Sequence, residues 1–372
     1  MTPPKLELGK RRRSLKVELG ERAYPIRIGW DTLQDLGPAV VRATRATQVA
    51  LVTVPEVGRR YGGSVTRSLR AAGLEVHRFE VPDGDATKNL KQAAKLYDAF
   101  LAKGMDRTSA VVALGGGMVG DLAGFVAATF LRGIAFVQVP TTLLAMVDAS
   151  VGGKVGVNLQ QGKNLVGAFH QPKLVWIDAR VLETMTRRGI SAGLAEVIKA
   201  AAIRDSTFFR QLEDSIEALQ ALDPAHLLPV LERACAIKAA VVARDERESG
   251  LRKILNFGHT LGHVVEQASG YRGVLHGEAV AMGMVFAAGR SEDLDYAPPG
   301  TQARLAALVE RAGLPGALPE LPRRVYLEGL RVDKKRVGDR ISFVVLKRIG
   351  RSAVVPLLPA EILPAAFPRR RD

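Results

Sequence analysis

The sequence predicts an α/β N-terminal domain with a parallel sheet, followed by a mostly α-helical C-terminal domain. Short apolar runs alternate with helical stretches in the first half of the chain, and strand-like runs nearly vanish after about residue 190. A length of 372 residues also suggests two domains. We therefore expect one domain over residues 1–187 and the other over residues 188–372.

In the first half, buried-type apolar runs and amphipathic stretches follow one another. The runs at 48–54, 75–81, 109–114 and 133–139 are typical of strands, and the stretches at 62–72 and 90–103 are typical of helices. Strands that alternate with helices favour a parallel sheet covered on both faces.

The second half is dominated by long Ala-, Leu-, Glu- and Arg-rich segments. Residues 194–203, 227–246, 260–267 and 278–290 have helical periodicity, and only residues 341–346 resemble a strand.

Composition excludes several classes of protein. The single cysteine, Cys235, excludes an internal disulfide framework and a multi-thiolate zinc site. No apolar run reaches membrane-spanning length and no signal-type stretch is evident, so we expect a cytoplasmic protein with no membrane partner. The net charge of +15 would suit nucleic acid or anionic small substrates, but aromatic residues are only 5% of the chain and much of the charge lies at the two ends.

A glycine turn follows the predicted strand at 109–114. Gly115, Gly117 and Gly120 satisfy G-x-G-x-x-G, a pattern that lets a pyrophosphate approach backbone N–H groups at a helix start. The acidic residue expected about 20 residues later is absent, because Pro140-Thr141-Thr142 lies there. This segment can be a cofactor-binding turn or a plain glycine turn. The polar loop at residues 82–88 can likewise bind a ligand or be a plain turn.

Two lysines beside glycines indicate an anionic ligand. Lys154 follows Gly152-Gly153, Lys163 follows Gly162, and Asp148 and Asn164 lie in the same stretch. Ammonium groups on a backbone that comes close to a ligand suit phosphate or carboxylate, although solvated lysines in a glycine-rich loop are the alternative.

Three histidines, His259, His263 and His276, fall within 18 residues. His259 and His263 share a helix face, but no Glu stands between them, so a metalloprotease base is missing. Two histidines and a carboxylate such as Glu196 would form a catalytic zinc site, and hydrogen-bonded core histidines are the alternative.

Taken together, these segments resemble the 3-dehydroquinate synthase family of sugar-phosphate cyclases. The resemblance runs from about Asp83 to Gly350, through the motifs GGGMVGDLAGFVAATFLRG, VPTTLLAMVDASVGGKVGVN, GKNLVGAFHQP, GLAEVIK, RKILNFGHTLGH and LHGEAVAMGM. It implies an NAD-binding α/β domain, a helical domain that binds Zn²⁺ or Co²⁺, and a homodimer with no nucleic-acid partner.

The reaction that the resemblance implies belongs to the shikimate route. The substrate, 3-deoxy-D-arabino-heptulosonate 7-phosphate, is oxidised transiently by NAD, loses phosphate, is reduced again and closes by an intramolecular aldol step to 3-dehydroquinate.

The resemblance also assigns residues to each ligand. The metal ligands are Glu196, His259 and His276. The NAD contacts are Asp83, Gly84, Asp85, Ala86, Thr87, Lys88, Gly117, Met118, Val119, Gly120, Asp121, Thr141, Thr142, Lys154, Lys163, Val181, Leu182, Glu183 and Thr184.

The remaining assignments concern the substrate. The resemblance implies that the substrate carboxylate is bound by Lys163, Lys238 and Arg252, and the ring hydroxyls by Asp148, Lys199 and Glu248. The phosphate falls to Lys154, Asn164, Asn256, His263 and one of Lys334 and Lys335, with Arg132 reaching a phosphate across the dimer. Where the family often has Asp-x-Asn for the cofactor ribose, this chain has Val54-Pro55-Glu56, and Glu56 is the candidate replacement.

Two related activities are the alternatives. A cyclase of the 2-epi-5-epi-valiolone or 2-deoxy-scyllo-inosose type acts on a substrate without a carboxylate, which Lys238, Arg252, Asn256 and His263 together disfavour. A metal-dependent polyol dehydrogenase is disfavoured by the paired lysines and Asn164. A nucleic-acid-binding protein would leave the histidines and glycine loops without a purpose.

Overall fold

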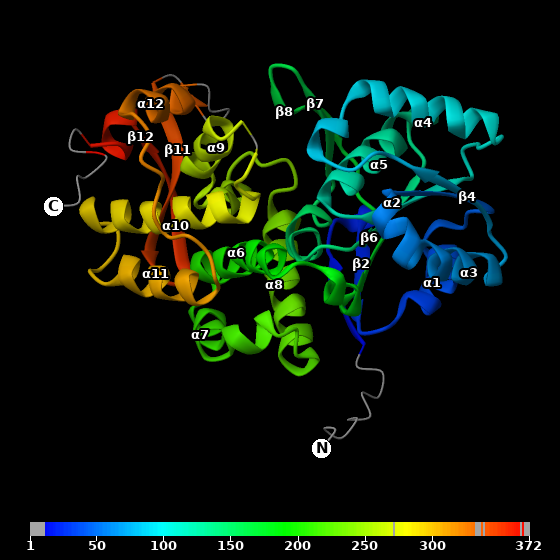
Figure 1. The fold of residues 1–372 in the computed structure, drawn as a ribbon, viewed down its shortest axis with the longest axis horizontal. Coiled ribbons are helices and arrows are strands. Elements are labelled where there is room, and N and C mark those ends of the chain that lie inside the picture. The colour runs from blue at the N-terminus through cyan, green and yellow to red at the C-terminus, as the bar shows by residue number, and fades with distance from the viewer. Residues whose placement is uncertain (1–11, 271, 332–335, 338, 365–366, 368–372) are drawn as a thin grey trace. The chain divides into compact units, whose positions relative to one another are not determined.

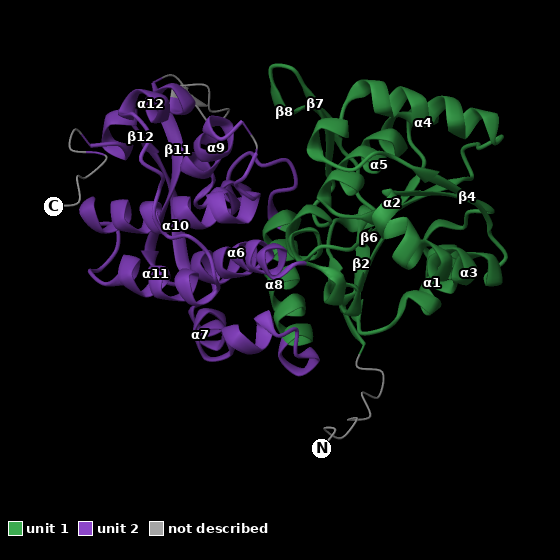
Figure 2. Cartoon of the chain, in the orientation of Figure 1, with its two compact units in different colours: residues 1–185, 227–243 green, residues 186–226, 244–372 purple. Residues whose placement is uncertain are grey.

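The computed structural model describes residues 12–270, 272–331, 336–337, 339–364 and 367. The chain divides into two compact units, shown in Figure 2. Unit 1 comprises Met1–Met185 and Leu227–Ala243, and unit 2 comprises Thr186–His226 and Arg244–Asp372. The boundary between residues 187 and 188 stays a prediction, and the division assigns residues 227–243 to the first unit.

Unit 1 is built around a seven-stranded sheet in the order β1-β2-β9-β6-β5-β3-β4. Its strands are β1 (Arg13–Val17), β2 (Tyr24–Gly29), β3 (Gln48–Thr53), β4 (Glu75–Glu80), β5 (Ala110–Gly115), β6 (Ala135–Pro140) and β9 (Leu174–Asp178). Every neighbouring pair is parallel except β1 and β2. The predicted parallel sheet is confirmed, and the antiparallel edge strand was not predicted.

Helices cover both faces of this sheet. They are α1 (Leu36–Thr44), α2 (Pro55–Val57), α3 (Gly63–Ala71), α4 (Leu90–Ala102) and α5 (Gly117–Thr129). Most of α8 (Pro224–Arg244) also belongs to unit 1. Helix α1 packs with α3, and α4 packs with α5 on the other side of the strands (Figure 1). All six residues of β5 are buried, as expected for a central parallel strand between two helical layers.

A hairpin of β7 (Lys154–Leu159) and β8 (Gly162–Phe169) was not predicted as strands. Its two chains run unusually close together at Gly156 and Gly167, where an added Cβ would lie 2.8 Å from Val166 O and 2.2 Å from Val155 O. Glycine therefore permits the pairing, although it makes the same segment look like a loop in sequence.

Within the described residues, unit 2 contains the seven remaining helices and a small sheet. Its helices are α6 (Arg187–Arg204), α7 (Ser206–Gln220), α9 (His259–Ala268), α10 (His276–Asp293), α11 (Thr301–Arg311) and α12 (Arg323–Arg331), and a short α13 (Pro359–Ile362) follows the sheet. The helices predicted here at 194–203, 260–267 and 278–290 are confirmed, as is the one at 227–246 in α8. No helix among the described residues combines the length and apolar character needed to cross a membrane.

The expectation of a single strand in the second half is wrong. The order β10-β11-β12 joins β10 (Arg336–Val337), β11 (Arg340–Arg348) and β12 (Arg351–Leu357). Strand β12 was missed because it contains Pro356, which is tolerated since β12 lies at the edge of this sheet.

Two glycines of α10 permit very close helix packing. An added Cβ would lie 1.8 Å from Ala192 O at Gly277 and 1.9 Å from Gly258 O at Gly283. The backbone of α10 therefore approaches both α6 and the residue before α9. This close packing brings the first residues of α9 and α10 next to α6.

Candidate functional site

The predicted metal ligands of unit 2 meet in one place. Glu196 comes from the middle of α6, whereas His259 and His276 are the first residues of α9 and α10. Glu196 Oε1 lies 3.7 Å from His259 Nε2 and 3.8 Å from His276 Nε2. One donor atom from each side chain falls within 4.8 Å of the others.

The two histidines are oriented through their other ring nitrogens. His259 Nδ1 lies 3.2 Å from Phe257 O, and His276 Nδ1 lies 3.2 Å from Glu266 Oε2. Such partners fix the tautomer of metal-bound histidines, which leaves Nε2 of each ring to face Glu196. His263 is close by, with its ring centroid 5.4 Å from that of His259 and 6.3 Å from that of His276.

The surroundings of Glu196 fit a divalent cation. Both carboxylate oxygens are buried, and Oε1, which lies near the two histidines, accepts no hydrogen bond within the described part of the chain. The positively charged neighbour is Lys199, one turn along α6, which forms an ion pair with Glu196 Oε2. A buried carboxylate with two imidazoles is the donor set of catalytic Zn²⁺ and also suits Co²⁺.

A second group of predicted residues lies just before α9. Asn256 Nδ2 donates to Glu248 Oε1 at 2.7 Å, and the Arg252 guanidinium, 2% exposed, donates to Glu246 O. Glu248 has a left-handed backbone with φ +60°. The segment Leu251–Asn256 is a 3-10 helix, so Arg252 and Asn256 do not share a face as α-helical spacing would predict.

Asp245 organises this loop, and sequence reasoning missed it. Its carboxylate accepts hydrogen bonds from the N–H groups of Ser249, Gly250 and Arg252 at 2.8–2.9 Å. Although burial opposes the effect, these donors lower the pKa of Asp245 to about 2. An Asp four residues before Ser-Gly was the available signal.

In unit 1 the glycine turn has the predicted strand–turn–helix form. Strand β5 ends at Gly115, and α5 begins at Gly117. Glycine is required here for close approach, because an added Cβ would lie 2.6 Å from Val119 at Gly115 and 2.7 Å from Gln138 at Gly120. Met118 is half-buried beside it, and Val119 is buried.

The turn is tied to the end of the next strand. Thr141 N donates to Gly115 O at 2.9 Å, and Thr142 Oγ1 accepts from Ala145 N at 3.2 Å. The predicted cofactor residues at the start of α5 and just after β6 therefore lie beside the same turn.

Lys88 lies at the centre of a polar network next to α5. Its ammonium, 5% exposed, lies 2.8 Å from Asp121 Oδ2 and 2.6 Å from Asn164 Oδ1. Asp85 also takes part, 2.9 Å from Lys163 Nζ and 3.6 Å from Lys88 Nζ. Asn164 has φ +52°, and its N–H donates to Asn158 Oδ1. Five predicted residues from three different segments, the loop before α4, helix α5 and strand β8, are thus brought together.

Charge and burial act in opposite directions on the two acids of this network. Burial raises the pKa of Asp121 above its ordinary value, despite the opposing charge of Lys88. For Asp85, burial is outweighed by the hydrogen bond from Lys163 and the charges of Lys88 and Lys163, so its pKa is lowered. Asp85 therefore stays ionised and holds both lysines in place.

The rest of the loop before α4 is exposed. Gly84 has φ +98°, Asp83 O lies 3.5 Å from Thr87 Oγ1, and Ala86 O accepts from Asn89 Nδ2 at 2.8 Å. Lys154 begins β7 with an exposed side chain. These residues lie on the predicted polar loop and on the unpredicted β7–β8 hairpin.

Helix α8 contributes to unit 1 as well. Lys238, 7% exposed, donates to Asp148 O at 2.7 Å and forms an ion pair with the Asp148 carboxylate. One turn earlier, the buried Cys235 Sγ lies 3.4 Å from Met146 O. The pairing of Lys238 with Asp148 was not predicted, because the two residues are 90 positions apart.

Three predicted cofactor residues line a cavity of 310 Å³ after β9: Val181, Glu183 and Thr184. Tyr61 closes one side, with its hydroxyl 2.7 Å from Thr184 Oγ1 and 3.0 Å from Val181 O. Leu182 is fully buried and does not line this cavity.

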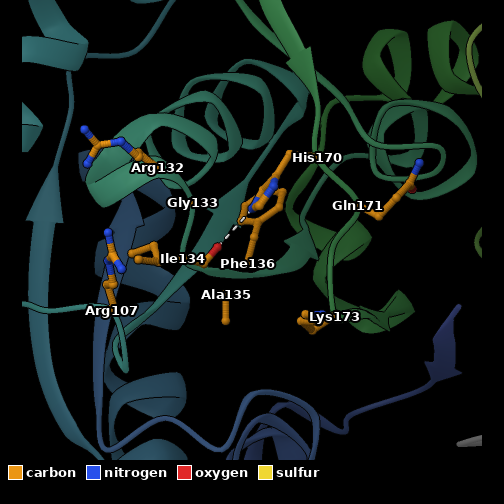
Figure 3. A pocket seen from close by; sticks show the side chains of 9 residues that line it. All are labelled: Arg107, Arg132, Gly133, Ile134, Ala135, Phe136, His170, Gln171 and Lys173. Atoms are coloured by element: carbon orange, nitrogen blue, oxygen red, sulfur yellow. Dashed lines mark hydrogen bonds between the residues drawn. The ribbon is translucent and has the colours of Figure 1, made fainter. Parts of the chain in front are cut away.

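Arg132 lines a different cavity, of 360 Å³, shown in Figure 3. Arg107 and Lys173 also line it, together with His170, whose Nε2 lies 2.9 Å from Ile134 O. Arg132 follows Leu131, and both have left-handed backbones with φ +68° and +49°. Lys334 and Lys335 lie outside the described residues.

Solved structures of two enzymes share this fold. A 2-deoxy-scyllo-inosose synthase complexed with carbaglucose-6-phosphate, NAD⁺ and Co²⁺ matches with a TM-score of 0.86 and 27% identity, over 94% of this chain and 98% of that one. A 2-epi-5-epi-valiolone synthase from Streptomyces hygroscopicus, with NAD⁺ and Zn²⁺ bound, matches with a TM-score of 0.84 and 27% identity, over 91% and 94%. Fold and site together define the class, that of the sugar-phosphate cyclases.

Sequence comparisons are more specific. Models of the 3-dehydroquinate synthase N-terminal and C-terminal regions match residues 78–192 and 193–336. The 3-dehydroquinate synthase of Symbiobacterium thermophilum is 52% identical over 343 residues, 91% of this chain and 96% of its own length. That of Geotalea uraniireducens is 48% identical over 337 residues, 91% and 94%. The chain belongs to the 3-dehydroquinate synthase family.

Proposed function

We propose that this chain converts 3-deoxy-D-arabino-heptulosonate 7-phosphate into 3-dehydroquinate and phosphate, with NAD and a zinc or cobalt ion. The observation that carries the proposal is the convergence of Glu196, His259 and His276, in a chain 42–52% identical to enzymes named 3-dehydroquinate synthase.

In this proposal Glu196, His259 and His276 hold the metal. When bound there, the ion polarises adjacent substrate hydroxyls as a Lewis acid. Lys199 is held against Glu196 and is buried, so its ammonium has a fixed position for hydrogen bonding to a hydroxyl. Asp148, which pairs with Lys238, and Glu248, which accepts a hydrogen bond from Asn256, serve the other ring hydroxyls.

When bound, NAD would supply reversible hydride transfer, so that it is catalytic rather than consumed. We assign its pyrophosphate to the Gly117–Asp121 turn, where α5 begins and backbone N–H groups are available. Thr141, Thr142, the loop 83–88 and residues 181–184 complete the assigned contacts, together with Lys154 and Lys163.

The carboxylate and the phosphate of the substrate are assigned to two separate groups of cationic and polar side chains. Lys163, Lys238 and Arg252 are proposed for the carboxylate. Lys154, Asn164, Asn256 and His263, with Lys334 or Lys335, are proposed for the phosphate. Holding both ends fixes the reacting carbons, which is the positional part of the rate enhancement.

We further propose a cytoplasmic homodimer in which Arg132 of one protomer reaches the phosphate bound by its partner. The left-handed turn at Leu131 and Arg132 supports this role, because such backbone strain is retained where it serves to place a side chain. Residues 1–187 are proposed as the cofactor domain and 188–372 as the metal and substrate domain, with Lys238 reaching a residue of the former.

The experiment is to incubate the purified chain with the heptulosonate phosphate, catalytic NAD⁺ and Zn²⁺. We expect stoichiometric phosphate, no net NADH and a product with the mass of dehydroquinate. Phosphate release only from sugar phosphates that lack the carboxylate would instead indicate another cyclase, of the valiolone type for a heptulose 7-phosphate and of the inosose type for a hexose 6-phosphate. Net accumulation of NADH would indicate a polyol dehydrogenase.

A further inference from the structure

The glycine turn of unit 1 is flanked by strands whose ends carry no carboxylate. Strand β5, which leads into the turn, lies between β3 and β6. Their carboxyl ends are in register, with Thr53 opposite Leu114 and Pro140 opposite Gly115. The residues that follow β3 and β6 are therefore the nearest ones to a ribose attached to a pyrophosphate at this turn.

The residue at the end of the strand next to a glycine turn determines whether the turn selects NAD⁺ or NADP⁺. An acidic residue at the end of the strand next to the glycine turn hydrogen-bonds the ribose 2′-hydroxyl and repels a 2′-phosphate, whereas an arginine there accommodates the phosphate. After β6 the chain reads Thr141-Thr142, and after β3 it reads Val54-Pro55. Val54 is 4% exposed and aliphatic, so it offers the ribose no acceptor.

The first acid after β3 is Glu56, and it is already paired. Its carboxylate binds Arg60 Nε at 2.6 Å and forms a second ion pair with Arg59. The two arginine side chains are 48% and 72% exposed, so both can reach a ligand from solvent. Glu56 therefore neutralises part of the arginine charge, and it is not oriented as a ribose ligand.

Arginines also outnumber carboxylates around Glu56. Gly58 and Gly62, which flank Arg59 and Arg60, pack against the guanidinium of Arg78, where added Cβ atoms would lie 2.2 and 3.0 Å away. Arg78 is paired with Glu80. This group, which we call the β3 arginine cluster (Arg59, Arg60 and Arg78), holds three guanidiniums against the two carboxylates Glu56 and Glu80. Asp83 follows β4, which is two strands away from β5, and Asp85 of the same loop is already paired with Lys163 and Lys88.

We propose that the dinucleotide site of this chain accepts a 2′-phosphorylated nicotinamide dinucleotide, NADP⁺, as well as NAD⁺, with Arg59 and Arg60 as the ligands of the 2′-phosphate. The inference rests on the proposed NAD-dependent function and adds the specificity of the same site. A planar guanidinium pair suits a phosphate dianion, and the phosphate competes with Glu56 for exposed groups that cost little to reorient.

The test is direct titration of the full-length, nucleotide-free protein with NAD⁺ and with NADP⁺ by calorimetry. The variants are R59A/R60A, the charge-retaining R59K/R60K, and R67A/R70A, which removes the same charge from exposed positions on α3. We expect the two dissociation constants of the unmodified protein to agree within about tenfold. We expect R59A/R60A to weaken NADP⁺ by about tenfold or more and NAD⁺ by less than about twofold.

The two controls separate charge from folding. R59K/R60K is expected to retain most of the NADP⁺ affinity, and R67A/R70A all of it, with unchanged thermal midpoints. If the unmodified protein binds NAD⁺ but binds NADP⁺ more than about tenfold more weakly, this inference is wrong and the proposed function still stands. Equal loss of both nucleotides in R59A/R60A would overturn the role of the arginines. Failure of the unmodified protein to bind either nucleotide would instead overturn the proposed cofactor, and this inference with it.

Discussion

Lys238 Nζ lies 2.7 Å from the main-chain oxygen of Asp148 and also pairs with the Asp148 carboxylate. The contact joins α8 to the π-helical turn Ala145–Ala149, two segments that sequence alone would assign to different domains. A buried ammonium with two oxygen partners fixes both the helix and the turn, so one pair serves structure and site at once.

Replacing Lys238 by Met should therefore affect stability and substrate binding together. Lys238→Met leaves the Asp148 oxygens without their buried donor, so we expect the free energy of unfolding to fall by about 1–3 kcal/mol. The substrate KM should rise, because the proposed carboxylate ligand is lost. Urea titration and steady-state kinetics measure the two effects. Lys103→Met, at an exposed position after α4, is the matched control and should change neither.

Glu266 should set the metal affinity through His276. Its carboxylate is 6% exposed and lies 3.2 Å from His276 Nδ1. Glu266→Gln keeps an acceptor but removes the charge, so we expect Zn²⁺ affinity to fall by about 10–100-fold. Competition with a chromogenic chelator measures the affinity without any turnover. Glu310→Gln, on the exposed face of α11, should leave it unchanged, and an unaltered affinity in Glu266→Gln would contradict a positioning role.

Gly277 should be intolerant of any side chain. An added Cβ would lie 1.8 Å from the main-chain oxygen of Ala192, so Gly277→Ala must push α10 away from α6. We expect a loss of about 1–3 kcal/mol in the free energy of unfolding, together with weaker metal binding, since His276 precedes it. Gly316→Ala, where the nearest atom would be 3.8 Å away, should be neutral. Equal stability of the two variants would show that the helices can separate at little cost.

Asp245 should hold the loop that carries Arg252. Asp245→Ala removes the acceptor of three backbone N–H groups, so the substrate KM should rise while the dissociation constant of NAD⁺ stays constant. Asp214→Ala, an exposed change on α7, should alter neither. A parallel rise in both constants would mean that Asp245 acts on the fold as a whole.

The same carboxylate gives a pH dependence. Its pKa in the folded protein, about 2, is below that of an unfolded Asp. The stabilisation that Asp245 gives is therefore complete above an unfolded pKa of about 4 and is lost as the pH falls from about 4 to 2. The difference in unfolding free energy between the unmodified protein and Asp245→Ala should shrink over that interval.

The sequence was sufficient for features that depend on local chemistry. The glycine turn at Gly115–Gly117 and the strands on each side of it were predicted because apolar runs and glycines mark them directly. The candidate metal ligands were predicted because His259 and His276 lie in a window of 18 residues, and because short motifs around them and around Glu196 resemble those of the family. What the sequence could not supply is their convergence, which depends on the close packing of Gly277 against Ala192.

Features that depend on specific side-chain contacts were missed. Asp245 and Glu266 are single acids in polar or helical sequence, and nothing local distinguishes an acid that holds a loop or a histidine from one that is solvated. Strand β12 was missed because Pro356 argues against a strand unless its edge position is known. Glu56 looked like a replacement ribose ligand, whereas the structure pairs it with Arg59 and Arg60.

Because residues 227–243 belong to unit 1, this unit cannot finish folding early in synthesis. A ribosome releases the seven strands of the sheet long before it releases α8, and residues 186–226, which belong to unit 2, emerge in between. Lys238 is therefore missing while the turn at Asp148 first collapses, and unit 1 is completed only after residue 243 has left the exit tunnel. Domains of many larger proteins fold in N-to-C order as they are synthesised. Here, by contrast, nascent chains stalled near residue 190 should be readily digested by protease, and chains stalled well beyond residue 243 should resist digestion.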